Sequence, residues 1–130
     1  MVALTLVDTD VLIAHLRGVV AARDWLLDAR RRGPVLVSAL GVAEVLGGMR
    51  SPERHDVRRL LATLRCEPVT RAVAEDAGEL QRVYRRSHSG ISLADYVVAA
   101  TARAHELRPA TLNVRHFPMF TDLEAPFSVT

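Results

Sequence analysis

The chain has 130 residues, a length that suits one hydrophobic core, so residues 1–130 are expected to form a single domain. Hydrophobic residues make up 49% and charged residues 25%, a balance that excludes an intrinsically disordered protein. All 17 basic residues are arginine and the net charge is +2, which excludes lysine chemistry such as a P-loop and permits nucleic acid binding without requiring it.

The first half of the chain alternates short apolar runs with stretches of helical spacing. Buried strands are expected at residues 3–7 and 35–37. The expected helices run from the turn at Asp8-Thr9 to about Leu16, over residues 20–31, and from a cap at Ser38 to the glycines at 47 and 48. This alternation of strand and helix is typical of a parallel βαβ arrangement.

The second half continues the alternation. Helices are expected to begin at Ser51, at Thr70 and at Ser92, and the body of the last one is apolar all round. Short strands are expected at residues 66–69 and 110–112, with a closing strand at 127–129 in an otherwise irregular tail. The whole pattern predicts an α/β fold, in which a small parallel sheet is flanked by helices on both faces.

Three carboxylates stand apart from the other charges of the chain. Glu44 and Asp95 are each the only formally charged residue in a long apolar stretch, and Asp8 shares the first such stretch only with Asp10. Because burial of an ionised carboxylate without a partner is costly, a carboxylate in such surroundings usually has a partner, and a divalent cation is one. Asp8, Glu44 and Asp95 are therefore candidate metal ligands.

Each of these acids also has a purely structural explanation. Asp8 could cap the first helix, and Glu44 could face solvent from its helix. Asp95 completes a capping box, S-x-x-D, with Ser92, a role that is compatible with a place in a site. Taken together, the three positions can converge at one edge of a parallel sheet, where ligands of such folds bind. Carboxylates gathered around Mg²⁺ or Mn²⁺ suit phosphodiester hydrolysis, because the metal lowers the pKa of water and stabilises the oxygens of the displacement.

Four segments resemble PIN-domain toxins of the VapC type, and their order and spacing match over essentially the whole chain. The segments are VDTDVLI at 7–13, Ala43-Glu44, SLAD at 92–95 and NVRHF at 113–117. The resemblance implies a PIN-like α/β/α fold and a magnesium- or manganese-dependent endoribonuclease that acts on structured RNA such as tRNA. It also implies a homodimer and a cognate antitoxin that holds the enzyme inactive.

By the same resemblance, Asp8 and Asp95 are the principal metal ligands, and Glu44 completes the acidic cluster directly or through water. Thr9 and Thr111 match hydroxyl positions near the site. These residues are expected to surround the metal and to assist the removal of a proton from the attacking water.

Asn113 departs from the family pattern, because many members carry a fourth acid at this position. An asparagine there contributes hydrogen bonds and no charge, so it joins the expected catalytic set while a second metal ion has less support. Asp122 and Glu124 lie in the irregular tail and are not expected in the site. The five histidines form no H-x-x-x-H pair and are interpreted as surface or packing residues, with His116 as the foremost exception.

Two other classes of function stay open at this stage. A non-catalytic PIN-like module that binds RNA or a partner would keep RNA affinity in EDTA and cut nothing. A phospho-acceptor signalling domain would explain paired acids after the first strand, although the absence of lysine argues against it. The single cysteine, Cys66, excludes an internal disulfide. The sequence also shows no signal peptide and no membrane-spanning stretch. Together with the single cysteine, these features favour a cytoplasmic location without membrane partners.

Overall fold

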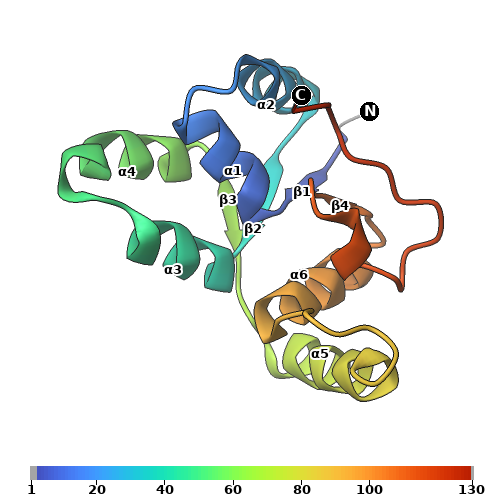
Figure 1. Cartoon of the computed structure of the whole chain (residues 1–130). Coiled ribbons are helices and arrows are strands. Elements are labelled where there is room, and N and C mark those ends of the chain that lie inside the picture. The colour runs from blue at the N-terminus through green and yellow to red at the C-terminus, as the bar shows by residue number, and fades with distance from the viewer. Residues whose placement is uncertain (1–2, 130) are drawn as a thin grey trace.

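The computed structural model describes residues 3–129, in which four parallel strands form one sheet between helices (Figure 1). The strands are β1 (Thr5–Val7), β2 (Val35–Ser38), β3 (Arg65–Glu67) and β4 (Pro109–Ala110). Their order across the sheet is β3-β2-β1-β4, and each neighbouring pair is parallel. The predicted α/β class, with a small parallel sheet flanked by helices, is confirmed.

The helices begin close to the expected residues. They are α1 (Thr9–Leu16), α2 (Val20–Arg32), α3 (Ala39–Gly48), α4 (Arg54–Ala62), α5 (Arg71–Tyr84) and α6 (Leu93–Ala104), with short 3₁₀ turns η1 (Ser51–Glu53) and η2 (Val114–His116). The side-chain oxygens of Ser38, Thr70 and Ser92 accept backbone N–H groups at the starts of α3, α5 and α6, as their positions predict. No helix among residues 3–129 has the length and apolar character needed to cross a membrane.

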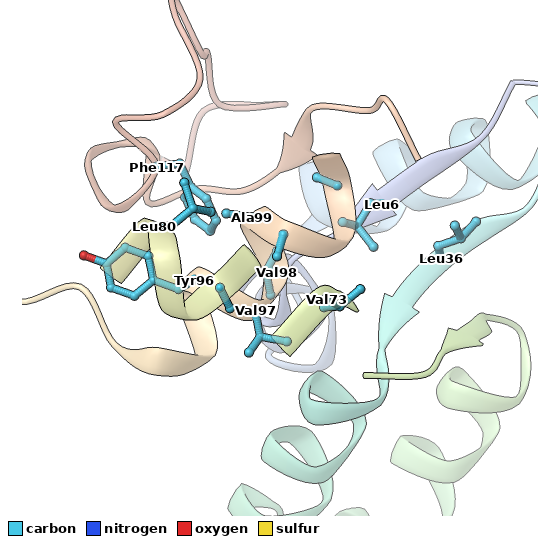
Figure 2. Close-up of a cluster of buried hydrophobic side chains, with 12 residues drawn as sticks. Leu6, Leu36, Val73, Leu80, Tyr96, Val97, Val98, Ala99 and Phe117 are labelled. Atoms are coloured by element: carbon cyan, nitrogen blue, oxygen red, sulfur yellow. The ribbon is translucent and has the colours of Figure 1, made fainter. Parts of the chain in front are cut away.

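Alternate residues of the strands bury their side chains on opposite faces of the sheet. Leu6 and Leu36 point into a core formed with α5 and α6, which includes Tyr96 and Phe117 (Figure 2). Val7 of β1 and Val35 and Val37 of β2 pack on the opposite face, where α1, α2, α3 and α4 cover them. Both faces of the sheet are thus buried, as expected for parallel strands.

Several strand predictions need correction. The first strand begins at Thr5 rather than residue 3, and the last covers Pro109–Ala110 rather than residues 110–112. The third strand ends at Glu67 rather than residue 69, because Pro68 has no N–H to donate to the β2 partner. The closing strand expected at residues 127–129 is wrong, because the structure places no strand at these residues. Phe127 instead lies against Trp25 of α2, with ring centroids 6.5 Å apart, so a side-chain contact links the tail to α2.

Candidate metal centre

Asp8 follows β1 directly and lies at the carboxyl edge of the sheet. Its backbone N–H donates to the carbonyl of Ala110 in β4 (2.9 Å), which extends the β1–β4 pairing by one residue. Its carboxylate caps α1, with Oδ1 accepting the backbone N–H of Thr9 (2.9 Å). The other oxygen, Oδ2, accepts the hydroxyl of Thr111 (2.8 Å). The predicted neighbours Thr9 and Thr111 therefore both contact Asp8, Thr9 through its backbone and Thr111 through its side chain.

Asp10 belongs to the same hydrogen-bond network, although the sequence prediction left it out of the site. Its Oδ2 accepts the backbone N–H of Leu112 (2.9 Å) and lies 3.2 Å from the hydroxyl of Thr111. Since that hydroxyl has one proton, it donates mainly to Asp8 at the shorter distance. The other oxygen of Asp10, Oδ1, is buried without a hydrogen-bond partner. The only signal in the sequence was that Asp8 and Asp10 share an otherwise uncharged stretch.

Asp95 occupies the first turn of α6 and completes the predicted capping box. Its Oδ2 accepts the N–H of Ser92 (3.1 Å), while the hydroxyl of Ser92 accepts the N–H of Asp95 (3.2 Å). The same Oδ2 lies 2.9 Å from Nδ1 of His116, the last residue of η2. His116, the foremost exception to the interpretation of the histidines as surface or packing residues, therefore contacts a candidate metal ligand.

Glu44 lies on α3 and is exposed, as its structural explanation allowed. Its position depends on Gly41, one turn earlier, where a Cβ atom would come within 3.1 Å of Thr9 and 3.2 Å of Val37. The glycine therefore lets α3 approach the start of α1. Burial of part of the side chain and the nearby charge of Asp95 raise the pKa of Glu44.

Asn113 lies three residues beyond the end of β4 and is exposed. A hydrogen bond from its backbone lowers the pKa of Asp10, against the larger effect of burial. Its backbone N–H donates to Thr111 Oγ1 (3.1 Å), and its side-chain Nδ2 lies 2.9 Å from Nδ1 of His116. The structure thus forms two local networks, one around Asp8 and one around Asp95. Asn113 contacts both networks, through its backbone to the first and its side chain to the second.

The electrostatic field joins these two networks. Burial raises the pKa of Asp8 to about 7. The negative charge of Asp10 and, to a smaller extent, that of Asp95 add to this effect. The hydrogen bonds from Thr111 and Thr9 lower the pKa in opposition to it. Burial also raises the pKa of Asp10. Within residues 3–129, neither Asp8, Asp10 nor Glu44 forms an ion pair with a basic side chain. The acids are consequently short of positive charge.

A divalent cation fits this site by its chemistry rather than by a ready-made cage. Among the described residues, no three His, Cys, Asp or Glu side chains stand close enough to form a complete metal site. The donors are carboxylate oxygens, which Mg²⁺ and Mn²⁺ prefer, and no thiolate lies among them. The buried Asp8, only 6% exposed, and the unpartnered Oδ1 of Asp10 are the features that a nearby cation would compensate.

A parallel α/β/α sandwich with acids at the carboxyl edge of its sheet defines a class, and comparison with known families identifies it. The PIN domain matches residues 5–117, so the chain belongs to the PIN-domain family. Within this family it is similar to Ribonuclease VapC10 of Mycobacterium tuberculosis, with 59% identity over 124 residues that cover 95% of this chain and 93% of that protein.

A more distant relative and a solved structure agree with this assignment. Ribonuclease VapC19 of Mycobacterium tuberculosis is 39% identical over 123 residues, which cover 94% of this chain and 98% of that protein. A toxin–antitoxin complex from Klebsiella pneumoniae contains a chain of the same fold, with a TM-score of 0.78 and 23% identity over 96% of this chain and 99% of that one. The predicted resemblance to PIN-domain proteins of the VapC type is confirmed.

Proposed function

We propose that the chain is a divalent-metal-dependent endoribonuclease and the toxin of a toxin–antitoxin pair. The observation that carries this proposal is the state of Asp8, a buried carboxylate whose pKa is raised to about 7 and which has no basic partner among the described residues. A buried acid of this kind at the carboxyl edge of a parallel sheet is typical of a functional site. Membership of the PIN-domain family and similarity to proteins named ribonucleases support RNA hydrolysis as its use.

In this proposal Asp8 and Asp95 hold Mg²⁺ or Mn²⁺, and Glu44 completes the cluster directly or through water. When bound, the cation supplies the Lewis acidity that activates water and stabilises charge on the phosphodiester. The other residues orient these ligands: Thr111 and the N–H of Thr9 fix the two oxygens of Asp8. Asn113 adds hydrogen bonds at the end of β4 but no charge.

Glu44 suits a further role as a proton acceptor. Its side chain is exposed, and its pKa lies above the usual range because of partial burial and Asp95. A carboxylate oxygen with a raised pKa accepts a proton more readily than an ordinary surface glutamate does. Glu44 would therefore take up the proton that water releases on attack at phosphorus.

The substrate, partners and location follow from the family resemblance and one surface feature. The substrate would be structured RNA such as tRNA, and the enzyme would be a cytoplasmic homodimer. A groove of about 590 Å³ between α1, α3 and α4 is lined by apolar side chains such as Ile13, Val45 and Met49 and by charged ones that include Glu44. An apolar helix of a cognate antitoxin fits such a groove and would lie beside the acidic cluster.

Incubation of the purified chain with total RNA tests this function. We expect cleavage in Mg²⁺ or Mn²⁺, none in EDTA, and recovery when the cation is restored. Asp8→Asn should abolish cleavage without loss of the fold, since an amide of the same shape still caps α1. Retained RNA binding without any cleavage would instead favour the non-catalytic PIN-like module, and equal cleavage in EDTA would exclude the metal mechanism.

A further inference from the structure

We propose that His116 is a positioning residue, which orients the Asp95 carboxylate through a hydrogen bond donated by its Nδ1–H. The inference rests on the proposed function and adds a residue to its site. His116 belongs to η2 and Asp95 to α6, yet Nδ1 and Oδ2 of the two side chains lie 2.9 Å apart. This contact joins the segment after β4 to the first turn of α6.

The two carboxylate oxygens of Asp95 differ in their hydrogen bonds. The N–H of Ser92 and Nδ1 of His116 both contact Oδ2. With one oxygen held by two donors, the rotation of the carboxylate is restricted and Oδ1 is the oxygen that remains for a cation. Ligand carboxylates in metal sites are commonly held in this manner by neighbouring donors.

The bond requires one particular tautomer of His116. A carboxylate oxygen only accepts, so Nδ1 must carry the proton in the Asp95 contact. The Nδ2 group of Asn113, also 2.9 Å away, needs Nδ1 as an acceptor, and one nitrogen cannot meet both demands. Because a bond to a carboxylate is stronger than a neutral one, the Nδ1–H form prevails, and Nδ1 is then not an acceptor for Nδ2 of Asn113.

The position of His116 is well supported by the residues around it. Its own N–H donates to the carbonyl of Asn113 (3.0 Å), and the N–H of Phe117 donates to Val114 (3.1 Å). Phe117 is 1% exposed in the core between the sheet and α6, so the histidine is attached directly to a buried anchor. The side chains of His116 and Asp95 are themselves 31% and 19% exposed, which limits competition from water. A site residue held on such a frame can orient its partner.

Substitutions that place an amide donor at the position of only one imidazole nitrogen test this role. In His116→Asn the amide Nδ2 replaces Nδ1, in His116→Gln a donor replaces Nε2 instead, and His116→Ala removes both. Mn²⁺ binding, measured from free Mn²⁺ by electron paramagnetic resonance, and the kcat for RNA cleavage are the two readouts. His55→Ala is the control, since His55 contacts Arg59 on α4 and no acid of the site.

We expect His116→Ala and His116→Gln to weaken Mn²⁺ binding and lower kcat by roughly 10- to 100-fold, the usual effect of losing a group that supports a ligand. His116→Asn should remain within about threefold of the wild type, because the donor to Asp95 is kept. Nitrogen-15 NMR of the wild-type imidazole should report the Nδ1–H tautomer. Circular dichroism identifies folded variants. If His116→Ala does not fold, the comparison of His116→Asn with His116→Gln tests the positioning role of His116.

Several outcomes would overturn the inference. Equal Mn²⁺ binding by all variants would mean that His116 only packs, and better function of His116→Gln than of His116→Asn would assign the role to Nε2. An Nε2–H tautomer would exclude the donated bond. If the wild type binds Mn²⁺ with the expected variant pattern but cuts no RNA, the proposed function fails while the positioning role stands. If the wild type cuts RNA and His116→Asn does not recover, the positioning role alone fails.

Discussion

The hydroxyl of Thr111 lies 2.8 Å from Oδ2 of Asp8, although 103 residues separate the two in the chain. The register of the sheet explains this contact, because Val7 lies opposite Ala110 and the next pair is Asp8 and Thr111. Thr111 is fully buried, so water does not compete for the bond. The bond lowers the pKa of Asp8 against the larger effect of burial and so helps to keep the carboxylate ionised.

Removal of this hydroxyl should impair the site while the core stays intact. Thr111→Val keeps the size and branching of the side chain and loses the hydrogen bond to a charged group, which is worth about 1.5–3 kcal/mol. We expect RNA cleavage to fall by roughly 10- to 100-fold on this basis. Thr111→Ser, which restores the hydroxyl, should recover most of the activity in the same assay. Full activity of Thr111→Val would show that Asp8 needs no such support.

Stability of the metal-free protein should depend on pH through Asp8. Its pKa rises from 3.8 to about 7 on folding, so between these values the folded state holds a proton that the unfolded state releases. The resulting stabilisation is complete below 3.8 and is lost as the pH rises toward 7. Asp8→Asn cannot ionise and should therefore be more stable than the wild type at pH 8, by at most roughly 4 kcal/mol.

Urea unfolding of the wild type and Asp8→Asn in EDTA, from pH 5 to pH 8, measures this difference. The advantage of the variant should shrink as the pH falls. Added Mn²⁺ should stabilise the wild type and not the variant, since the cation needs the ionised carboxylate. A pH-independent difference between the two proteins would mean that Asp8 is ionised throughout this range.

Asp10 should matter for stability and for the alignment of Thr111. Asp10→Ala leaves the backbone N–H of Leu112 without its acceptor, a loss that costs about 1–3 kcal/mol for a buried donor. Asp10→Asn keeps an acceptor oxygen and should lose less stability. Asp28→Ala is a suitable control because it removes only an exposed ion pair with Arg32 on α2. Equal unfolding free energies for Asp10→Ala and this control would contradict the assigned role of Asp10.

The groove beside α3 should bind the antitoxin. Met49 lines this groove at the end of α3, so Met49→Glu places a charge where an apolar helix is expected to pack. We expect the affinity of this variant for the cognate antitoxin, measured by calorimetry, to fall at least about tenfold, or by roughly 1.4 kcal/mol. Val20→Glu, on an exposed apolar position of α2, is the matched control. Unchanged binding by Met49→Glu would place the partner on another surface.

Local sequence signals predicted much of the fold because their causes are local. The caps at Ser38, Thr70 and Ser92 each depend on bonds to residues at most three positions away. The prediction of a strand at 127–129 was wrong because the apolar residue Phe127 packs against Trp25 of α2. Local chemistry thus indicated where helices begin, whereas tertiary packing decided what the tail does.

The candidate site was less predictable because its contacts are long-range. Asp10 bonds residues more than 100 positions away, and no periodicity reports such a contact. The isolation of Glu44 among apolar residues suggested burial, yet it is exposed, because its neighbours on the outer face of α3 are the small residues Ala43, Gly47 and Gly48. His116 stood out only through its place in the family-like segment, and its contact with Asp95 depends on the path of η2.

The position of the metal ion in the site can be measured directly. Anomalous diffraction from crystals soaked in Mn²⁺ at pH 8 would locate the cation without reference to activity. We expect a single strong peak in contact with carboxylate oxygens of Asp8 and Asp95, with Glu44 at the same ion directly or through water. A peak on Asp122 or Glu124 in the tail, or no peak beside Asp8 in a protein that cleaves RNA, would contradict it.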